Sequence, residues 1–417
     1  MKKKPMTLEQ HRLLREVKQL MTNAGGNGNH AKAKMGTDAG HPVLLTQQVG
    51  EFLTSHYDFR YNLLTEETEF RPAGKCGTAF LPIGKRELNT FCLEAHAQGI
   101  SCWDKDLSRY IYSTYIPAYH PFHLYMNELP EWDGVDRLEA LARRISSHSV
   151  WVRGFHIWML ALTAQWTGLQ NIHANSVAPI LVSSEQGRQK STFCRALMPP
   201  ALQRYYSDNL KLTAQGNPER LLAEMGLLNM DEFDKYNPQK MPLLKNLMQM
   251  SSLNICKAHQ KNFRNLPRIA SFIGTSNRFD LLNDPTGSRR FICIEVKHVI
   301  DCDGIEHAQI YAQLKAELSG GARYWFTKEE ERELQRHNTA YYRACPAEEV
   351  FHACFRPALS GEAYEQLSAA AIYKELKSYN SAAMLGSSPN TFGQVLSATG
   401  TVRKHTKYGN VYLVVRR

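Results

Sequence analysis

Hydrophobic and polar positions between residues 177 and 296 predict strands that alternate with helices. Short apolar runs are separated by longer stretches with helical spacing, a pattern typical of a buried sheet covered by helices. The charged stretch Ile305–His337 follows and predicts a solvated helical face that closes this part of the chain. We therefore expect an α/β core over residues 171–346. The predicted strands are Ala178–Ser183, Gly226–Met230, Arg268–Gly274 and Arg290–Val296.

The flanking segments have other patterns and predict three further domains. Residues 1–40 join a short amphipathic piece to a polar, glycine-rich tract, which predicts a mobile basic arm. Residues 41–170 are mixed but mainly helical and predict an α+β N-terminal domain. Residues 347–417 hold two predicted helices, Ser368–Ser378 and Pro389–Ala398, followed by two alternating runs. Two helices before a hairpin predict a winged-helix-like domain.

Net charge adds a prediction about partners. The 417 residues carry a formal charge of +10, and the excess lies at the two ends. Residues 1–35 hold eight Lys or Arg and two acids, and residues 351–417 hold eight and three. Basic ends of this kind favour contact with nucleic acid. The apolar runs are too short to span a membrane and no secretory signal is visible, so we expect a cytoplasmic protein without a membrane partner.

The cysteines predict neither disulfides nor a metal site. There are nine, an odd number, and they are scattered along the chain without a CxxC pair. This spacing argues against a disulfide framework and against a zinc site. We expect reduced and mostly packed thiols.

The strand Ala178–Ser183 leads into residues of the kind that hold nucleotide phosphates. A phosphate-binding loop needs backbone N–H groups, a lysine that reaches the β and γ oxygens, and a hydroxyl for Mg²⁺. Lys190 and Ser191 match these roles, although Ser184 and Gln189 replace the two glycines of GxxxxGK(S/T). An ordinary strand–turn–helix is the alternative. The predicted ATP-binding residues are Ser184, Gly187, Gln189, Lys190, Ser191, Thr192 and Asp231.

Polar residues at the later strands extend this prediction. Asp231 and Glu232 follow an apolar strand, where Asp231 would hold Mg²⁺ with Ser191 and Glu232 would act as the general base. Asn277 ends the next strand and would position the attacking water, and a capping pair and a plain turn residue are the alternatives. Arg289 and Arg290 begin the last strand and would act on a neighbouring subunit's nucleotide, or form an ordinary ion pair. This order predicts an ATPase core arranged like a ring-forming helicase or AAA+ module.

These residues also resemble a known family. The chain is similar to the virulence-associated E (VirE/VapE-like) proteins of bacterial mobile elements and prophages, a P-loop group related to superfamily 3 helicases and often found beside or fused to primases. Most members carry glycine at the position of Gln189, so the resemblance implies roles chiefly for Lys190, Ser191, Asp231, Glu232 and Asn277. It covers roughly residues 75–350 and rests on Tyr119–Phe122, Leu129–Arg137, the loop at Lys190, Asp231–Asp234, Phe272–Asn277 and Leu282–Phe291.

Two basic segments are predicted to contact DNA. In superfamily 3 helicases the interval before the Asn-bearing strand carries a hairpin that grips single-stranded DNA, and the resemblance implies this role for Lys257, His259, Lys261 and Arg264. A solvated basic loop is the alternative. The last 17 residues carry five Lys or Arg and no acid, which predicts sequence-tolerant contacts to a DNA backbone, with protein docking as the alternative. The residues expected to make them are Arg403, Lys404 and Lys407.

Together these features predict an ATP-dependent, helicase-like or remodelling ATPase. It would act on single-stranded DNA in the replication of a mobile element or prophage, as a homo-oligomeric ring and with a primase as partner. The alternative is a degenerate P-loop scaffold that binds DNA and recruits a primase or another replication partner without turnover. Gln189 favours the scaffold, whereas the full set of polar residues at the strand ends opposes it.

Overall fold

The computed structural model describes residues 41–75, 77–169, 173–213, 216–256, 263–282, 285–342, 346–359, 361–385, 388–407 and 409–417. The predicted arm and the predicted DNA contacts Lys257, His259 and Lys261 lie outside these ranges. Among the described residues, the chain divides into two compact units, one formed by residues 41–59 and Phe70–Ile116 and the other by Arg60–Glu69 and Pro117–Arg417. The four domains expected from the sequence stay a prediction.

The first unit packs three helices against a small group of aromatic side chains. Phe91 lies at the centre, with the ring of Tyr57 at 4.6 Å and that of Phe70 at 5.1 Å between centroids. Two of the strands continue into the second unit, and the sheet order is β3-β2-β1-β4. The elements are α2 (His41–His56), β1 (Tyr57–Asn62), β2 (Thr68–Pro72), β3 (Leu81–Pro82), α3 (Lys85–Ala97) and α4 (Asp104–Ile111), and the sheet also includes β4 (Ala118–Tyr119) of the second unit.

A five-stranded sheet of order β11-β5-β10-β7-β6 forms the centre of the second unit. All pairs in it are parallel, as near-continuous apolar runs predict for strands that are buried on both faces. The expected α/β architecture is confirmed, and β10 begins three residues later than predicted. The strands are β5 (Ala178–Val182), β6 (Tyr206–Ser207), β7 (Leu227–Met230), β10 (Ser271–Ser276) and β11 (Phe291–Glu295).

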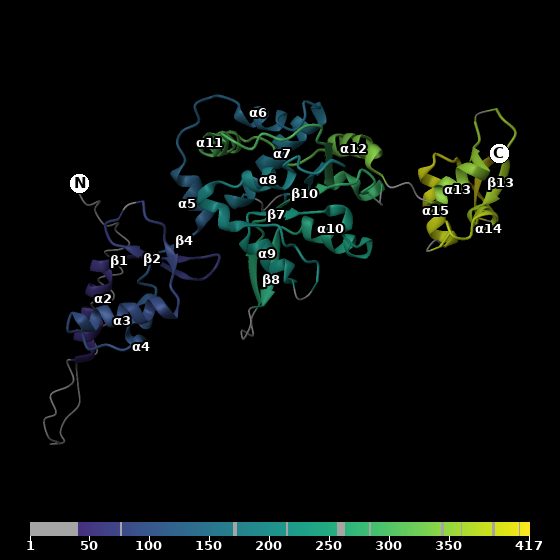
Figure 1. Cartoon of the computed structure of the whole chain (residues 1–417). Coiled ribbons are helices and arrows are strands. Elements are labelled where there is room, and N and C mark those ends of the chain that lie inside the picture. Colours follow the sequence, from purple (N-terminus) through teal and green to yellow (C-terminus); the bar gives the residue numbers. More distant parts are fainter. Residues whose placement is uncertain are drawn as a thin grey trace, which may run out of the picture. The chain divides into compact units, whose positions relative to one another are not determined.

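Helices cover both faces of this sheet (Figure 1). Alternate side chains of one strand enter different clusters: Leu181 joins the core of α6, α7 and α11, whereas Ile180 and Val182 join that of α9 and α10. The charged stretch Ile305–His337, which was expected to be helical, forms two helices, α11 and α12. The helices are α5 (Pro121–Glu128), α6 (Arg137–Arg143), α7 (Ser149–Trp166), α8 (Lys190–Ala196), α9 (Pro218–Glu224), α10 (Met241–Gln249), α11 (His307–Ser319) and α12 (Lys328–His337).

Short elements also belong to this unit. The strands β8 (Ser252–Cys256) and β9 (Phe263–Pro267) form an antiparallel pair on either side of residues that the structure does not describe. No helix in the described part of the chain is long and apolar enough to cross a bilayer. The 3₁₀ helices are η1 (Pro200–Tyr205), η3 (Phe233–Lys235), η4 (Pro238–Lys240), η5 (Pro285–Arg290) and η6 (Asn338–Tyr341).

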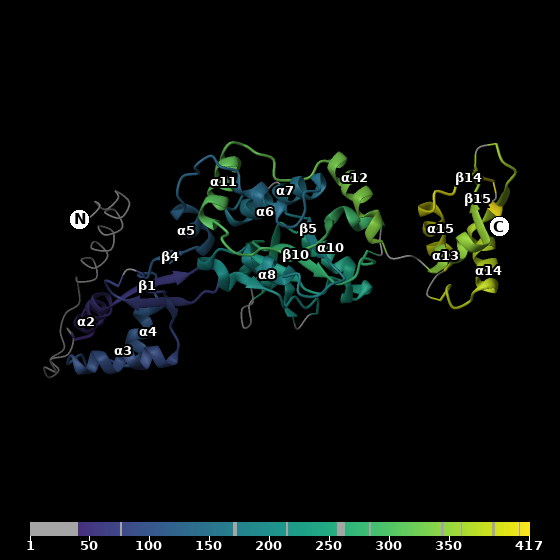
Figure 2. The same ribbon diagram turned by 45° about the horizontal axis from the view of Figure 1, so that its top comes forward.

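The C-terminal residues build their own small core of helices and an antiparallel sheet (Figure 2). Both predicted helices and the predicted hairpin are present, together with a third helix and two strands that were not predicted. Strand β15 pairs with each of the other three strands. The elements are α13 (Pro346–Cys354), β12 (Phe355–Pro357), β13 (Glu365–Ser368), α14 (Ala369–Tyr379), α15 (Pro389–Ala398), β14 (Arg403–Thr406) and β15 (Gly409–Arg416).

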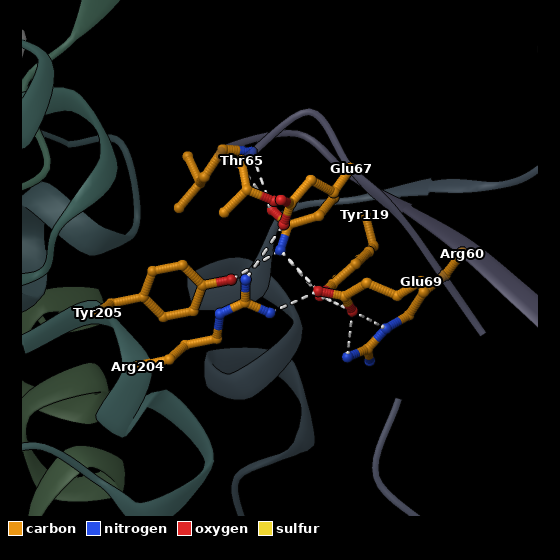
Figure 3. A network of polar contacts seen from close by, with 9 residues as sticks. Arg60, Thr65, Glu67, Glu69, Tyr119, Arg204 and Tyr205 are labelled. Atoms are coloured by element: carbon orange, nitrogen blue, oxygen red, sulfur yellow. Dashed lines mark hydrogen bonds and ion pairs between the residues drawn. The ribbon is translucent and has the colours of Figure 1, made fainter. Parts of the chain in front are cut away.

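A buried carboxylate ties residues 60–69 to η1 (Figure 3). Glu69 has no exposed surface and accepts hydrogen bonds from Arg60 at 2.8 Å, Arg204 at 2.7 Å and the hydroxyl of Tyr119 at 2.7 Å. Burial alone would raise the pKa of Glu69, but the hydrogen bonds from Tyr119, Asn62 and Arg60 outweigh it and lower this pKa. The carboxylate therefore stays ionised and fixes four segments of the chain together.

A second buried charge, the guanidinium of Arg268, lies just before β10. This side chain has no exposed surface, and burial lowers its pKa to about 9, which still leaves it charged at neutral pH. Its Nη2 group donates to Gln165 Oε1 at 3.0 Å and to Asn175 O at 2.5 Å. Three further acceptors are carbonyls in or just after the last turn of α10, where the helix dipole favours a cation. They are Leu247 O, Met248 O and Met250 O.

We predict that Arg268→Ala lowers the free energy of unfolding by about 3 kcal/mol or more, because it leaves buried acceptors unpaired and opens a cavity. The control is Arg264→Ala, since the ion pair of Arg264 with Glu66 is exposed and should be worth at most about 1 kcal/mol. Urea denaturation of both variants measures the difference. Equal losses in the two variants would show that the buried arginine is not the structural anchor.

Candidate functional site

Parallel strands bring the predicted site residues to one edge of the sheet. The register pairs Ser276 with Val182 and Gly274 with Met230, so β5, β7 and β10 end side by side. The residues that follow these three carboxyl ends are therefore neighbours, although they lie far apart in the sequence. This edge holds Lys190, Ser191, Asp231, Glu232 and Asn277.

Lys190 is the first residue of α8 and is only 8% exposed. Its ammonium donates to Ser183 O at 3.1 Å and to Asn277 Oδ1 at 2.9 Å. Burial lowers the pKa of Lys190, while the nearby carboxylates of Asp231 and Asp234 act in the opposite direction. Because both hydrogen-bond acceptors are neutral, the positive charge is held in place without being neutralised by contact.

Two hydroxyl groups donate to one carboxylate oxygen of Asp231. Ser191 Oγ donates to Asp231 Oδ1 at 2.8 Å, and Thr275 Oγ1 donates to the same oxygen at 2.5 Å. Thr275 Oγ1 also accepts from the backbone N–H of Glu232 at 3.3 Å, which holds that residue at φ +50°. The carboxylate of Glu232 points to Lys235, with 2.6 Å between Oε1 and Nζ.

Two residues of this edge were missed as site residues in the sequence analysis. Thr275 fixes Asp231 as described, and Asp234 accepts from Ser276 Oγ at 2.9 Å and from the N–H of Asn277 at 3.3 Å. Asp234 thereby sets the turn that carries Asn277. Both residues lie within segments on which the resemblance rests, Asp231–Asp234 and Phe272–Asn277, but their bonding partners depend on the register of β7 and β10.

The loop that precedes Lys190 makes two turns with positive φ. Gly187 has φ +77°, and Gln189 has φ +61° and ψ +25°, a left-handed conformation that costs a residue with a Cβ about 1–2 kcal/mol. The Gln189 side chain is exposed, as are Ser184 and Thr192. This position thus accepts a side chain, but at the expense of backbone strain.

The predicted arginines lie where the strands begin, at the opposite end of the sheet from Lys190. Phe291 pairs with Ala178, the first residue of β5, so Arg289 and Arg290 precede the amino end of β11. Lys190 follows the carboxyl end of β5. Arg289 forms an ion pair with Glu331 of α12 at 3.0 Å. The two arginines are therefore not brought together with the other site residues of the same chain.

The residues predicted to bind DNA fall in separate places. Arg264 on β9 is bonded to Glu66, whereas Arg403, Lys404 and Lys407 are exposed around the C-terminal hairpin. The Lys404 ammonium lies 5.3 Å from the ring centre of Tyr364. Arg416 counts toward the basic charge of this segment, but it is paired with Glu365 and Glu375.

Comparison with known proteins gives two family matches. A model described as the virulence-associated protein E-like domain matches residues 126–343, and a domain of unknown function (DUF3874) matches residues 344–414. No curated protein matches the chain.

Solved structures give weaker similarities. The apo structure of the NrS-1 C-terminal region (305–718) is 12% identical with a TM-score of 0.43, covering 89% of this chain and 99% of that one. An A-form apo structure of the same region is 16% identical with a TM-score of 0.39, covering 71% and 68%. Similarity at this level assigns no activity to the chain.

We predict that Gln189→Gly raises the free energy of unfolding by about 0.5–1 kcal/mol, because glycine adopts the left-handed conformation without a Cβ penalty. The matched control is Gly187→Ala, whose added Cβ would meet no atom within 4 Å, so that backbone strain alone should lower stability. Urea denaturation without nucleotide measures both. A loss of stability in Gln189→Gly would contradict the assignment of strain to this residue.

Proposed function

The chain belongs to the virulence-associated protein E-like family, and on this premise we propose that it is a P-loop ATPase of AAA+ or superfamily 3 type that acts on DNA in the replication of a mobile element. The observation that carries the proposal is the hydrogen-bonded set of Lys190, Asn277, Ser191 and Asp231 at the ends of three neighbouring strands. These residues would hold ATP and Mg²⁺.

The order of the strands supports a ligand site at this edge. From β5 the chain goes to the far strand β6, returns through β7 to β10 on one side of β5, and then crosses to β11 on its other side. Ligands of open α/β sheets bind outside the carboxyl ends of the strands, where the connections diverge to the two sides. The loop that carries Lys190 leaves β5 at that point.

The spacing of Ser191 and Asp231 fits a magnesium ion. Octahedral Mg²⁺ has Mg–O distances of about 2.0–2.1 Å, which separates adjacent ligands by about 2.9 Å. The two oxygens already lie 2.8 Å apart, joined by a hydrogen bond. Bound ATP with its Mg²⁺ would supply the phosphoryl group and neutralise the charge that develops on it.

The remaining residues have roles that their contacts allow. The Lys190 ammonium has three N–H groups, of which two are engaged, so that one is left for a phosphate oxygen. Asn277 presents its Oδ1 to Lys190 and keeps its Nδ2 group to orient water. Glu232 reaches the reacting water only after it leaves Lys235, and this exposed ion pair is cheap to break.

The far position of Arg289 and Arg290 favours an oligomer. Neither can reach the phosphate site of its own chain, since they precede the opposite end of the sheet. A ring of identical subunits would place them against the next subunit's nucleotide. Either arginine would then neutralise charge in the transition state, with Arg289 first released from Glu331.

The C-terminal residues would supply sequence-tolerant DNA binding. We assign them a winged-helix-like fold, with α14 and α15 followed by the β14–β15 hairpin. Arg403, Lys404 and Lys407 are exposed there and would contact phosphates rather than bases. A scaffold without turnover is the second candidate, favoured by the strained Gln189 and by the bond of Glu232 to Lys235.

We predict Mg²⁺-dependent ATP hydrolysis that single-stranded DNA stimulates. Lys190→Ala should lose both nucleotide binding and turnover, whereas Glu232→Gln should keep binding and lose turnover by about 10²–10⁴-fold. Steady-state phosphate release and nucleotide titration measure the two effects, with the exposed Lys240→Ala as the control. Nucleotide binding without turnover in the wild type would favour the scaffold.

We predict that alanine at Arg403, Lys404 and Lys407 together weakens binding to single-stranded DNA and lowers the slope of log affinity against log salt by about 2, since each lost phosphate contact removes about 0.7. Arg416→Ala is the matched control, because that guanidinium is already engaged by two carboxylates. Fluorescence anisotropy over a salt series measures the slope. An unchanged slope in the triple variant would remove the hairpin from the DNA-binding surface.

A further inference from the structure

The first compact unit holds a cluster of two thiols and an imidazole that takes no part in the proposed ATPase site. Cys92, His96 and Cys102 each offer one ligand atom, and these atoms all lie within 4.8 Å of one another. Cys92 and His96 are four residues apart on α3 and therefore share one face of that helix. Cys102 lies two residues before Asp104, the first residue of α4.

A reversal of the chain after α3 brings the third residue to the other two. Gly99 has φ +81°, and the N–H of Ile100 donates to Ala95 O at 3.0 Å, so the backbone turns back along the helix it has just left. Cys102 is then 2% exposed. This fold-back is a property of the backbone and does not require a bound ion.

The backbone carbonyl of Cys102 is hydrogen-bonded to the side chains of both Cys92 and His96. His96 Nε2 lies 2.6 Å from Cys102 O, and Cys92 Sγ donates to the same oxygen at 3.6 Å. Cys92 Sγ and His96 Nε2 are 3.8 Å apart. Cys92 and Cys102 are both free thiols.

We propose that Cys92, His96 and Cys102 form a binding site for Zn²⁺ or a similar thiophilic divalent cation. A tetrahedral zinc with Zn–S of about 2.3 Å and Zn–N of about 2.0–2.1 Å separates its sulfur and nitrogen ligands by about 3.5 Å. The observed 3.8 Å between Cys92 and His96 is close to that edge. Two sulfurs and one imidazole nitrogen form a donor set that suits zinc and does not suit Mg²⁺.

Charge and access also fit such an ion. Two thiolates with a neutral imidazole balance a charge of +2 without a further acid. Cys102 is buried, Cys92 is half-buried and His96 is exposed, so the cluster opens to solvent on the side of His96. Water can occupy the fourth position there. The ion replaces the thiol protons and the hydrogen bond from His96 to Cys102 O.

The bound cation would act as a structural clip. It would join α3 to the segment that leads into α4, between two cysteines that are ten positions apart in the sequence. The spacing Cys-x3-His-x5-Cys has no CxxC pair, and the cysteine pattern alone therefore argues against zinc. The Cys–His pair at i,i+4, followed by a glycine and a third ligand, is the signal that would have found the site.

Cobalt titration of the reduced, metal-free full-length protein tests the proposal. We expect one Co²⁺ per chain, with a thiolate-to-cobalt band and the strong visible bands of a tetrahedral site, and displacement by Zn²⁺. Cys92→Ser and His96→Gln should each weaken binding about tenfold or more. Cys354→Ser is the matched control, since this half-buried cysteine belongs to a different core and should leave the titration unchanged.

The variants separate a metal site from a folding defect. His96 is exposed and Cys92 half-buried, so these substitutions should leave the far-ultraviolet circular dichroism unchanged, whereas Cys102→Ser alters a buried position. Zn²⁺ should also raise the thermal midpoint of the wild type and leave that of Cys92→Ser unchanged. Absence of a thiolate band in the reduced wild type, or a band that persists in Cys92→Ser, would overturn the proposal.

Discussion

The buried guanidinium of Arg268 is the constraint on which the arrangement of the central sheet depends. It bonds to Asn175, which lies just before β5, and to Gln165 of α7, while its own position lies just before β10. The amino ends of the two central strands are thereby tied to one helix. At the opposite ends of the same strands, the register that pairs Ser276 with Val182 lets Lys190 and Asn277 meet.

Two side chains of this unit, Arg268 and Lys190, carry a buried positive charge, but they differ in the donors that remain for a ligand. Both Arg268 and Lys190 are bonded to neutral acceptors rather than to carboxylates. All three nitrogens of Arg268 donate to protein oxygens, so none of them is left to bind a ligand. Lys190 lies at the edge of the sheet, next to an exposed loop, and keeps donor capacity for an anion. The first charge is fully engaged inside the fold, whereas the second keeps a free donor at the edge of the sheet.

Much of the central sheet was predictable because buried parallel strands leave a clear apolar pattern, and because residues after parallel strands must share an edge. The same logic explains the misses. Arg268 stood at the start of a predicted strand, and the residues next to it in the sequence give no sign of the carbonyls that accept its hydrogen bonds. Thr275 and Asp234 matter through bonds across strands, which need the register. The cluster around Cys102 depends on the chain reversal at Gly99, which brings together residues from a helix and a loop.

Backbone strain at the sheet edge argues that this arrangement is maintained for more than stability. Among the described residues, four other than glycine have positive φ, and two of them are Gln189 and Glu232. Each costs on the order of 1 kcal/mol or more, which persists only where the surroundings fix the conformation. Thr275 does this for Glu232 with the same hydroxyl that holds Asp231. Backbone strain and polar contacts therefore meet at the edge of the sheet that holds Lys190 and Asp231.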